Sequence, residues 1–233
     1  MATLYSPRII TDGLVLCLDA ANVKSYPGSG TTWTNLSGNS YNGTLTNGPT
    51  FSSANNGSIV FNGTNNYVDC GNLGSGFSNF TVEIWFKSTN VANYRNPIDC
   101  NWLQENASYS NLGPRLEQNN SGNLTWVVGS GSNVYSNLTV VNSGLNSTPY
   151  HCAVIVKSSS TNFNSYYNGN YITNISFSNW GGSMSSVNIG RGFSTSGERW
   201  FSGNISVVKI YNIALTASQI LQNYNALRGR YGL

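Results

Sequence analysis

The acidic side chains are the residues of this sequence best suited to bond-breaking chemistry, and there are only eight of them. Hydrolysis of a glycosidic bond uses two carboxyl groups, about 5–5.5 Å apart in retaining enzymes and about 6.5–9.5 Å apart in inverting ones. On a strand, acids at positions i and i+2 or i+4 share a face at such a spacing. None of the eight has another acid there, and Glu83, in a strand-like run beside Trp85, stands alone. A catalytic pair would have to come from distant strands, so we predict that the chain is not an enzyme.

Other catalytic and cofactor-binding patterns are missing from the sequence. His151 is the only histidine and directly precedes an apolar run, so we expect a structural role for it. No G-x-S-x-G nucleophile elbow, phosphate-binding glycine loop or Cys/His metal spacing occurs. We predict no cofactor. Calcium bound by an aspartate at the rim, together with backbone and asparagine carbonyl groups, stays an alternative, although the sequence identifies no particular ligands.

The cysteines and the first residues of the chain bear on where the protein is made. Cys17, Cys70, Cys100 and Cys152 are far apart and form no C-x-x-C pair, which predicts free, mostly buried thiols in a reducing cytosol. The first residues lack the charged and apolar regions of a secretory signal peptide. No apolar run is long enough for membrane insertion, and no Lys/Arg cluster favours nucleic acid as a partner.

The composition favours recognition over catalysis. Charged residues make up 8% of the chain and aromatic residues 12%, and asparagine occurs 36 times. Rigid aromatic rings with short amides and hydroxyls suit the apolar faces and hydroxyl groups of sugars. Trp102, Tyr109 and Trp180 lie in turn-rich segments and are our candidate exposed carbohydrate-binding residues. The alternative is that each of these three rings caps a sheet edge or packs under a loop. Trp85 and Trp126 lie in strand-like runs, and we expect both to serve in packing.

Strand-sized runs recur between turn clusters along the whole chain, which is typical of an all-β protein. In 80–87, apolar residues alternate with Thr81, Glu83 and other residues of the opposite face. Asn168-Gly169 between tyrosines predicts a hairpin with a type I′ turn. The expected strands are 14–18, 58–63, 67–70, 80–87, 151–156 and 205–211.

One helix is expected near the end of the chain. Thr216 is a suitable N-cap, and Gln219 three residues later completes a capping-box pattern. Gly229 is placed to end the helix. Four apolar or aromatic residues at helical spacing predict its buried face: Ile220, Leu221, Tyr224 and Leu227.

These segments, taken in order, resemble laminin-G-like, concanavalin A-like jelly-roll domains. The resemblance covers about residues 13–228 and is weakest over 90–146, where we expect the function particular to this chain. It implies an all-β, antiparallel two-sheet jelly-roll sandwich with one short C-terminal helix. We assign 1–12 to an N-terminal arm and 13–233 to the domain. The residues that carry the match are Phe61, Gly63, Tyr67, Val68, Ile189, Gly190, Arg191, Phe201, Gly203, Ile205, Ile210, Tyr211, Leu215, Ile220 and Tyr224.

The opening of the chain, with G-L-V-L-C-L-D-A-A-N and Y-P-G-S-G-T-T-W, resembles structural proteins of tailed bacteriophages. This implies a virion component synthesised in the host cytoplasm, with other virion proteins as partners and several copies on each particle. We therefore predict a non-enzymatic surface protein of the head or tail that binds host or environmental glycans. Two alternatives remain: a glycan depolymerase with dispersed carboxylates, and a purely structural cement protein.

Overall fold

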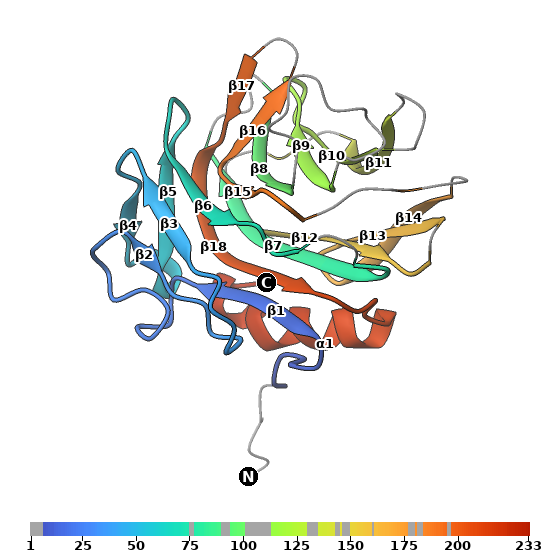
Figure 1. Ribbon diagram of the computed structural model, residues 1–233, viewed down its shortest axis with the longest axis horizontal. Coiled ribbons are helices and arrows are strands. Elements are labelled where there is room, and N and C mark those ends of the chain that lie inside the picture. Colours follow the sequence, from blue (N-terminus) through green and yellow to red (C-terminus); the bar gives the residue numbers. More distant parts are fainter. Residues whose placement is uncertain are drawn as a thin grey trace.

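Two antiparallel β-sheets stack face to face and carry nearly all the regular structure of the chain (Figure 1). The computed structural model describes residues 7–74, 77–89, 94–100, 113–129, 135–142, 145, 150–159, 161–176, 180, 184–194 and 197–233. The predicted two-sheet jelly-roll sandwich with a short C-terminal helix is confirmed in these residues.

The two sheets are named sheet 1 and sheet 2 here, and their strands are given in spatial order. Sheet 1 contains β14 (Asn170–Ser176), β13 (Asn162–Tyr167), β12 (His151–Lys157), β7 (Phe80–Ser88), β18 (Ser202–Tyr211), β5 (Ser58–Asn62) and β4 (Thr50–Ser52), with β1 (Leu14–Asp19) also paired to β18. Sheet 2 contains β11 (Tyr135–Asn142), β10 (Asn123–Gly129), β9 (Arg115–Gln118), β8 (Arg95–Cys100), β15 (Val187–Ile189), β6 (Tyr67–Gly71), β3 (Gly43–Thr46) and β2 (Thr32–Trp33).

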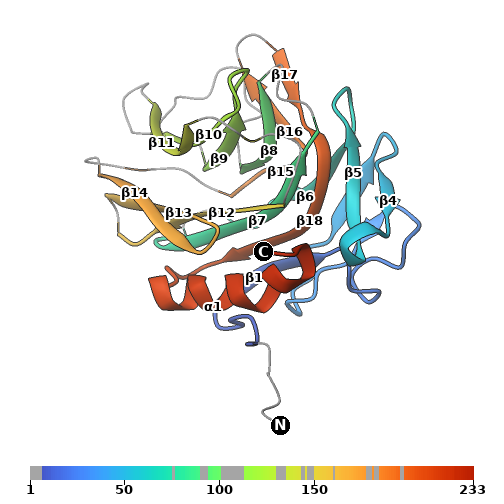
Figure 2. The same cartoon turned by 180° about the vertical axis from the view of Figure 1, so that it is seen from behind.

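Three shorter features complete the described architecture. A hairpin of β16 (Arg191–Ser194) and β17 (Gly197–Trp200) connects β15 in sheet 2 with β18 in sheet 1. The helix α1 (Ala217–Leu227) runs along the outer face of sheet 1 (Figure 2). Single turns of 3₁₀-helix are formed by Ala54–Asn56 and Arg228–Tyr231.

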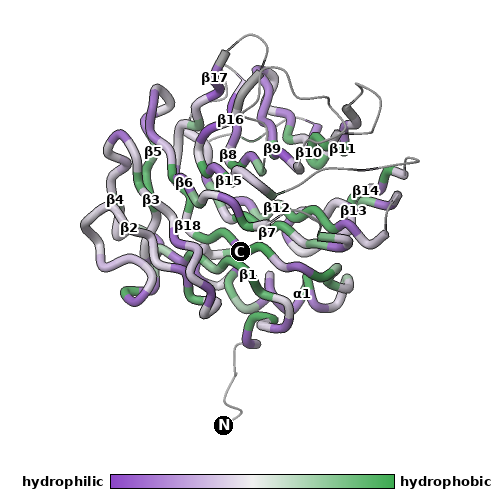
Figure 3. The backbone as a smooth tube through the Cα atoms, in the orientation of Figure 1, coloured by the Kyte–Doolittle hydropathy of each residue, from purple (hydrophilic) through white to green (hydrophobic). Residues whose placement is uncertain are grey.

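Strand β7 lies in the middle of sheet 1 and shows how the core is divided. Phe80, Val82 and Ile84 are 0% exposed and face sheet 2, as their alternation predicts. Trp85 points the other way into a second apolar layer beneath α1. Apolar residues accordingly follow the central strands of the sandwich (Figure 3). The four cysteines are free and buried, as predicted.

The capping box of α1 forms as expected, but the buried face of the helix differs from the prediction. Thr216 Oγ1 accepts a hydrogen bond from the backbone N–H of Gln219, and the Gln219 side chain accepts one from the Thr216 N–H. Leu221 is 46% exposed, whereas Asn223 is fully buried. The prediction for Leu221 is therefore wrong, because Asn223 takes the inner position to bond groups of the sheet.

The end of α1 also differs from the expected stop at Gly229. The chain continues through a 3₁₀ turn over Arg228–Tyr231, and the left-handed residue is Gly232, with φ of 72°. The continuation places Tyr231 against Trp85, with ring centroids 4.8 Å apart. The helical segment therefore ends at a left-handed glycine, as expected, but at Gly232 instead of Gly229, once Tyr231 is buried.

The turn between β13 and β14 follows the prediction from Asn168-Gly169. Both residues have positive φ, 49° and 80°, as a type I′ turn requires. A Cβ at Gly169 would lie 2.8 Å from the ring of Tyr224, so glycine is also needed for close approach to α1.

The described part of the N-terminal arm contacts α1. Ile10 N donates to Asn223 Oδ1 at 2.8 Å, and Gln222 Nε2 donates to the Arg8 carbonyl oxygen at 2.7 Å. Tyr211 Oη donates to the Ile10 carbonyl oxygen at 3.1 Å. The boundary at residue 12 stays a prediction, and residues 1–6 lie outside the described part of the chain.

Candidate functional site

Glu83, the strand-borne acid, lies in the interior rather than on a substrate surface. It is 1% exposed, and its Oε1 accepts hydrogen bonds from Trp85 Nε1 at 2.8 Å and Lys209 Nζ at 2.5 Å. Its Oε2 accepts a hydrogen bond from Asn223 Nδ2 at 2.9 Å. A polysaccharide has no access to this carboxylate, so Glu83 does not serve as a hydrolytic acid or base in this fold.

Asp69 and Asp99 are two acids from distant strands that share the outer face of sheet 2. Both lie opposite Asn188, on the strands that flank β15. Asp69 is exposed, but Asp99 is 0% exposed. Because one member is closed off from solvent, these two acids do not form an open catalytic pair.

His151 has the structural role expected from its sequence position. It is 5% exposed, and its Nδ1 lies 2.5 Å from the hydroxyl oxygen of Tyr167, whose ring stacks on the imidazole. Burial lowers the pKa of His151 to about 4, which keeps the ring neutral at pH 7.

We expect acid to destabilise the protein through His151. In the unfolded chain the imidazole binds its proton near pH 6.5, whereas in the folded protein it does so only near pH 4. Stability is therefore complete above about pH 6.5 and falls by on the order of 3 kcal/mol as the pH approaches 4. Urea unfolding at several pH values, with His151→Gln as the comparison, measures this effect. An unchanged pH slope in His151→Gln would contradict it.

Trp180, expected as an exposed ring, is instead buried. Its side chain is 9% exposed and packs against Phe80 and Phe163, with ring centroids 5.3 Å and 5.8 Å away. Lys157 Nζ lies 5.0 Å from the centre of the indole ring. The expectation of an exposed sugar-binding ring is wrong for Trp180, because it fills space between the sheets. Trp102 and Tyr109 lie outside the described residues.

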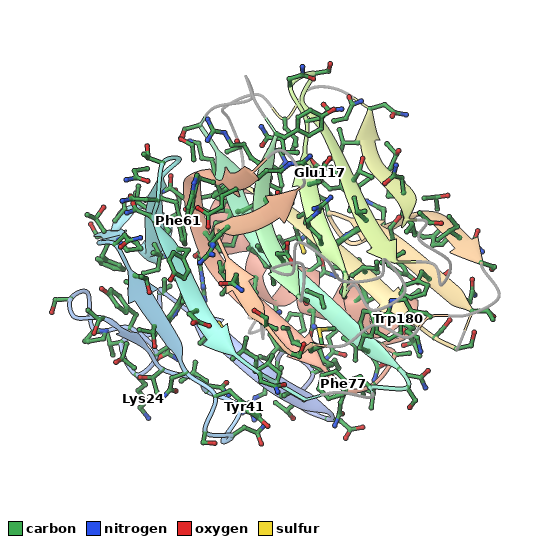
Figure 4. The ribbon with its side chains drawn as sticks, turned by 45° about the horizontal axis from the view of Figure 1, so that its top comes forward. Lys24, Tyr41, Phe61, Phe77, Glu117 and Trp180 are labelled. Atoms are coloured by element: carbon green, nitrogen blue, oxygen red, sulfur yellow. The ribbon has the colours of Figure 1, made fainter. Side chains whose placement is uncertain are left out.

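The β16–β17 hairpin lies next to β8 (Figure 1). Aromatic rings and arginines instead gather at this hairpin. We call this group the arginine–aromatic cluster and define it by five residues. Figure 4 shows Glu117, its acidic neighbour on β9, well away from Trp180 at the other end of the sandwich. The cluster consists of Tyr67, Tyr94, Arg191, Arg199 and Trp200.

The first half of the cluster is built around Arg191. Its guanidinium lies over the rings of Tyr67 and Trp200, 4.6 Å and 5.4 Å from their centres. The centroids of the two rings are 6.0 Å apart, so one guanidinium group contacts both rings. Arg191 Nη2 also pairs with Glu198 Oε1 at 2.9 Å. Tyr67, Arg191 and Trp200 are all partly exposed.

The second half of the cluster is built around Arg199. Its guanidinium lies 4.6 Å from the ring centre of Tyr94, which is 46% exposed, and pairs with Glu117. Arg115 Nη2 pairs with the same Glu117 carboxylate at 2.8 Å. A shared carboxylate therefore fixes Arg199 against sheet 2.

A glycine turn and the hydrogen bonds of Arg95 determine where the side chains of the cluster lie. Gly190, with φ of 80°, turns the chain from β15 into β16, and a Cβ there would lie 2.4 Å from the ring of Phe61. Arg95 Nη1 donates to the carbonyl oxygens of Gly63 and Trp200, at 2.8 Å and 2.7 Å. Arg191 and Trp200 then lie opposite each other in the hairpin register. Sequence reasoning missed the cluster because Tyr67, on β6, and Tyr94, just before β8, are far from the hairpin in the sequence.

The loop after β5 is rich in asparagine, whose side-chain oxygen is a ligand type that calcium takes. Asn62 Oδ1 accepts hydrogen bonds from the backbone N–H groups of Thr64, Asn65 and Asn66. The amide closes its own loop, so its oxygen is already used. Within the described residues no group of three His, Cys, Asp or Glu side chains could hold a metal ion.

The sequence pattern of the concanavalin A-like lectin/glucanases superfamily matches residues 62–221, more than half of the chain. The chain belongs to this superfamily. No curated protein matches it. In the described part of the chain, no helix has the length and apolar character needed to cross a membrane.

Several solved structures share the fold. The botulinum neurotoxin serotype D binding domain is 16% identical, with a TM-score of 0.68 over 92% of this chain and 52% of that chain. The binding domain of Paraclostridial Mosquitocidal Protein 1 is 16% identical, with a TM-score of 0.68 over 93% and 52%. The binding domain of botulinum neurotoxin DC with rat synaptotagmin II is 14% identical, with a TM-score of 0.69 over 94% and 52%. The chain spans about half the length of these structures.

Proposed function

We propose that this protein is a non-enzymatic glycan-recognition module on the surface of a phage particle, with the arginine–aromatic cluster as its binding site. The observation that carries the proposal is the pair of partly exposed rings, Tyr67 and Trp200, held beside Arg191 and Glu198. Tyr94 and Arg199 repeat the combination nearby.

The chemistry of the cluster suits a sugar. A pyranose ring presents an apolar face that stacks on an aromatic ring, while its hydroxyl groups need fixed donors and acceptors. The Arg191 and Arg199 guanidinium groups supply donors, and Glu198, with 37% of its side chain exposed, supplies acceptors. Since the ion pairs preorganise these groups, little side-chain entropy remains to be lost on binding.

Two further observations support recognition. The binding domain of botulinum neurotoxin DC has been solved in complex with SialylT, and cell entry of botulinum neurotoxin type C depends on interaction with two ganglioside molecules. Glu83 and Asp99 are buried and not accessible to a polysaccharide, although the superfamily also includes glucanases. These facts favour binding over hydrolysis.

The virion location rests on the opening residues that resemble tailed-phage structural proteins. A particle displays many copies, and a weak site gains avidity when a second copy binds the same surface. We propose that other virion proteins are the partners of this chain in a multimeric arrangement. Electron microscopy of purified particles at side-chain resolution tests this proposal, and absence of the protein from particles would contradict it.

The proposed site makes a testable prediction for glycan binding. On an array of bacterial and environmental glycans, Trp200→Ala is expected to weaken binding of the best ligand at least about tenfold, or roughly 1.4 kcal/mol. Tyr171→Ala, which removes a ring that is 53% exposed on β14, is the matched control and should bind as the unaltered protein does.

The other outcomes distinguish the alternatives. Equal binding by Trp200→Ala and the unaltered protein would place the site elsewhere and reject the cluster. Particle assembly with no glycan bound would instead favour a structural cement protein. Release of reducing sugars from a bound polysaccharide would favour a depolymerase.

A further inference from the structure

A lysine, a glutamate and an asparagine meet in the apolar layer between α1 and sheet 1. Lys209 on β18 lies opposite Glu83 on β7, and Asn223 approaches them from α1. Their exposed fractions are 1%, 1% and 0%. The side chains of the surrounding layer are large and mostly apolar, and they include Trp85, Val154, Val207, Tyr211, Leu215 and Ile220.

We propose that this triad joins itself covalently, through an isopeptide bond between Lys209 Nζ and Asn223 Cγ. The Glu83 carboxylate contacts both reacting groups: Oε1 lies 2.5 Å from Lys209 Nζ, and Oε2 lies 2.9 Å from Asn223 Nδ2. One carboxylate therefore bridges the nucleophilic nitrogen and the nitrogen that must leave.

The proton balance of the reaction follows from these contacts. Glu83 takes a proton from the Lys209 ammonium group, and the neutral Nζ attacks Asn223 Cγ. The Nζ–Cγ bond forms and the Cγ–Nδ2 bond breaks. Of the two protons that Nζ loses, one reaches the leaving nitrogen, which departs as ammonia, and the other stays on Glu83, which ends as a neutral carboxylic acid. No oxidant or cofactor is needed.

The carbonyl oxygen of Asn223 has a donor ready for the charge that develops on it. Ile10 N donates to Asn223 Oδ1 at 2.8 Å, from the backbone of the N-terminal segment. A backbone N–H aimed at a developing oxyanion in a site without water is an effective source of stabilisation. Tyr211 Oη accepts a second hydrogen bond from Asn223 Nδ2 at 2.9 Å and so positions the amide.

The surroundings also favour the reaction energetically. An ion pair removed from water carries a large desolvation cost, so a product without the buried ion pair is favoured. The product replaces a buried amine and amide by one neutral amide. Because the triad is held by tertiary contacts, the reaction is expected only after the domain has folded.

The mass of the intact, denatured chain tests the proposal directly. We expect a mass below that of the amino-acid sequence by one ammonia, and a peptide in which Lys209 and Asn223 are joined. A chain of full mass would overturn the proposal. So would an ammonia loss that maps to a succinimide at an Asn-Gly pair such as Asn168-Gly169.

Three variants assign the reaction to the triad. Asn223→Ala and Glu83→Gln are expected to show the mass of their own sequences, without loss of ammonia. Asn225→Ala changes a half-buried asparagine two residues after Asn223 on the same helix. It is the matched control and should retain the joined peptide. A joined peptide in Asn223→Ala would overturn the assignment, and the unaltered chain decides the question even if a variant does not fold.

Discussion

Replacing Lys209 by methionine is expected to lower the free energy of unfolding by about 3–5 kcal/mol relative to the chain before the proposed link forms, because it leaves Glu83 buried without its cation. Glu83 is 1% exposed and would keep only the hydrogen bonds from Trp85 and Asn223. Two neutral donors do not compensate for a carboxylate removed from water. Urea unfolding at pH 7 measures the loss, with the exposed Lys24→Met as the control.

A double variant separates the unpaired charge from other effects at Lys209. Glu83→Gln combined with Lys209→Met removes both charges, so it should be more stable than Lys209→Met alone. The proposed link to Asn223 is lost in both variants, so the difference between them reports the unpaired charge. If the double variant is as unstable as Lys209→Met, then the unpaired Glu83 charge is not the cause of the instability.

Trp180→Ala is the second change with a large expected effect, about 3–5 kcal/mol of destabilisation, because it empties a site between aromatic neighbours. Phe80 and Phe163 would each lose a ring contact, and Lys157 would lose the ring beneath its ammonium group. Thermal or urea unfolding measures the loss, and Tyr171→Ala, an exposed ring, should cost far less.

The same variant tests where sugars bind. If Trp180 acts only in packing, then Trp180→Ala that is still folded at low temperature should bind glycans as the unaltered protein does. Weakened binding with unchanged stability would contradict the packing role and restore Trp180 as a recognition residue.

The fold could be predicted because its local signals agree with the tertiary structure. The alternation in β7 specifies which side chains face sheet 2, and Asn168-Gly169 specifies a turn that only positive φ values allow. The capping box at Thr216 fixes where α1 begins. Each signal lies within a few residues, where backbone sterics and hydrogen bonding decide the outcome.

The candidate site could not be predicted in the same way, because it depends on contacts between distant segments. Tyr67 on β6 meets Arg191 and Trp200 only after the hairpin has folded over sheet 2. Asn223 was not among the residues expected on the buried face of the helix, yet it bonds to Ile10, Glu83 and Tyr211. Turn-rich flanks made Trp180 resemble a surface residue, whereas the space between the sheets needed a large ring. For Trp102 and Tyr109 the carbohydrate-binding role stays a prediction.

The N-terminal segment and α1 lie together at one pole of the sandwich, and the β16–β17 hairpin stands at the other (Figure 1). If the protein is attached to a carrier near Arg8, Trp200 and Tyr94 therefore face away from the carrier, toward solvent. Fusion of a carrier protein at that pole should leave ligand capture undiminished, whereas a carrier inserted within the hairpin should block it.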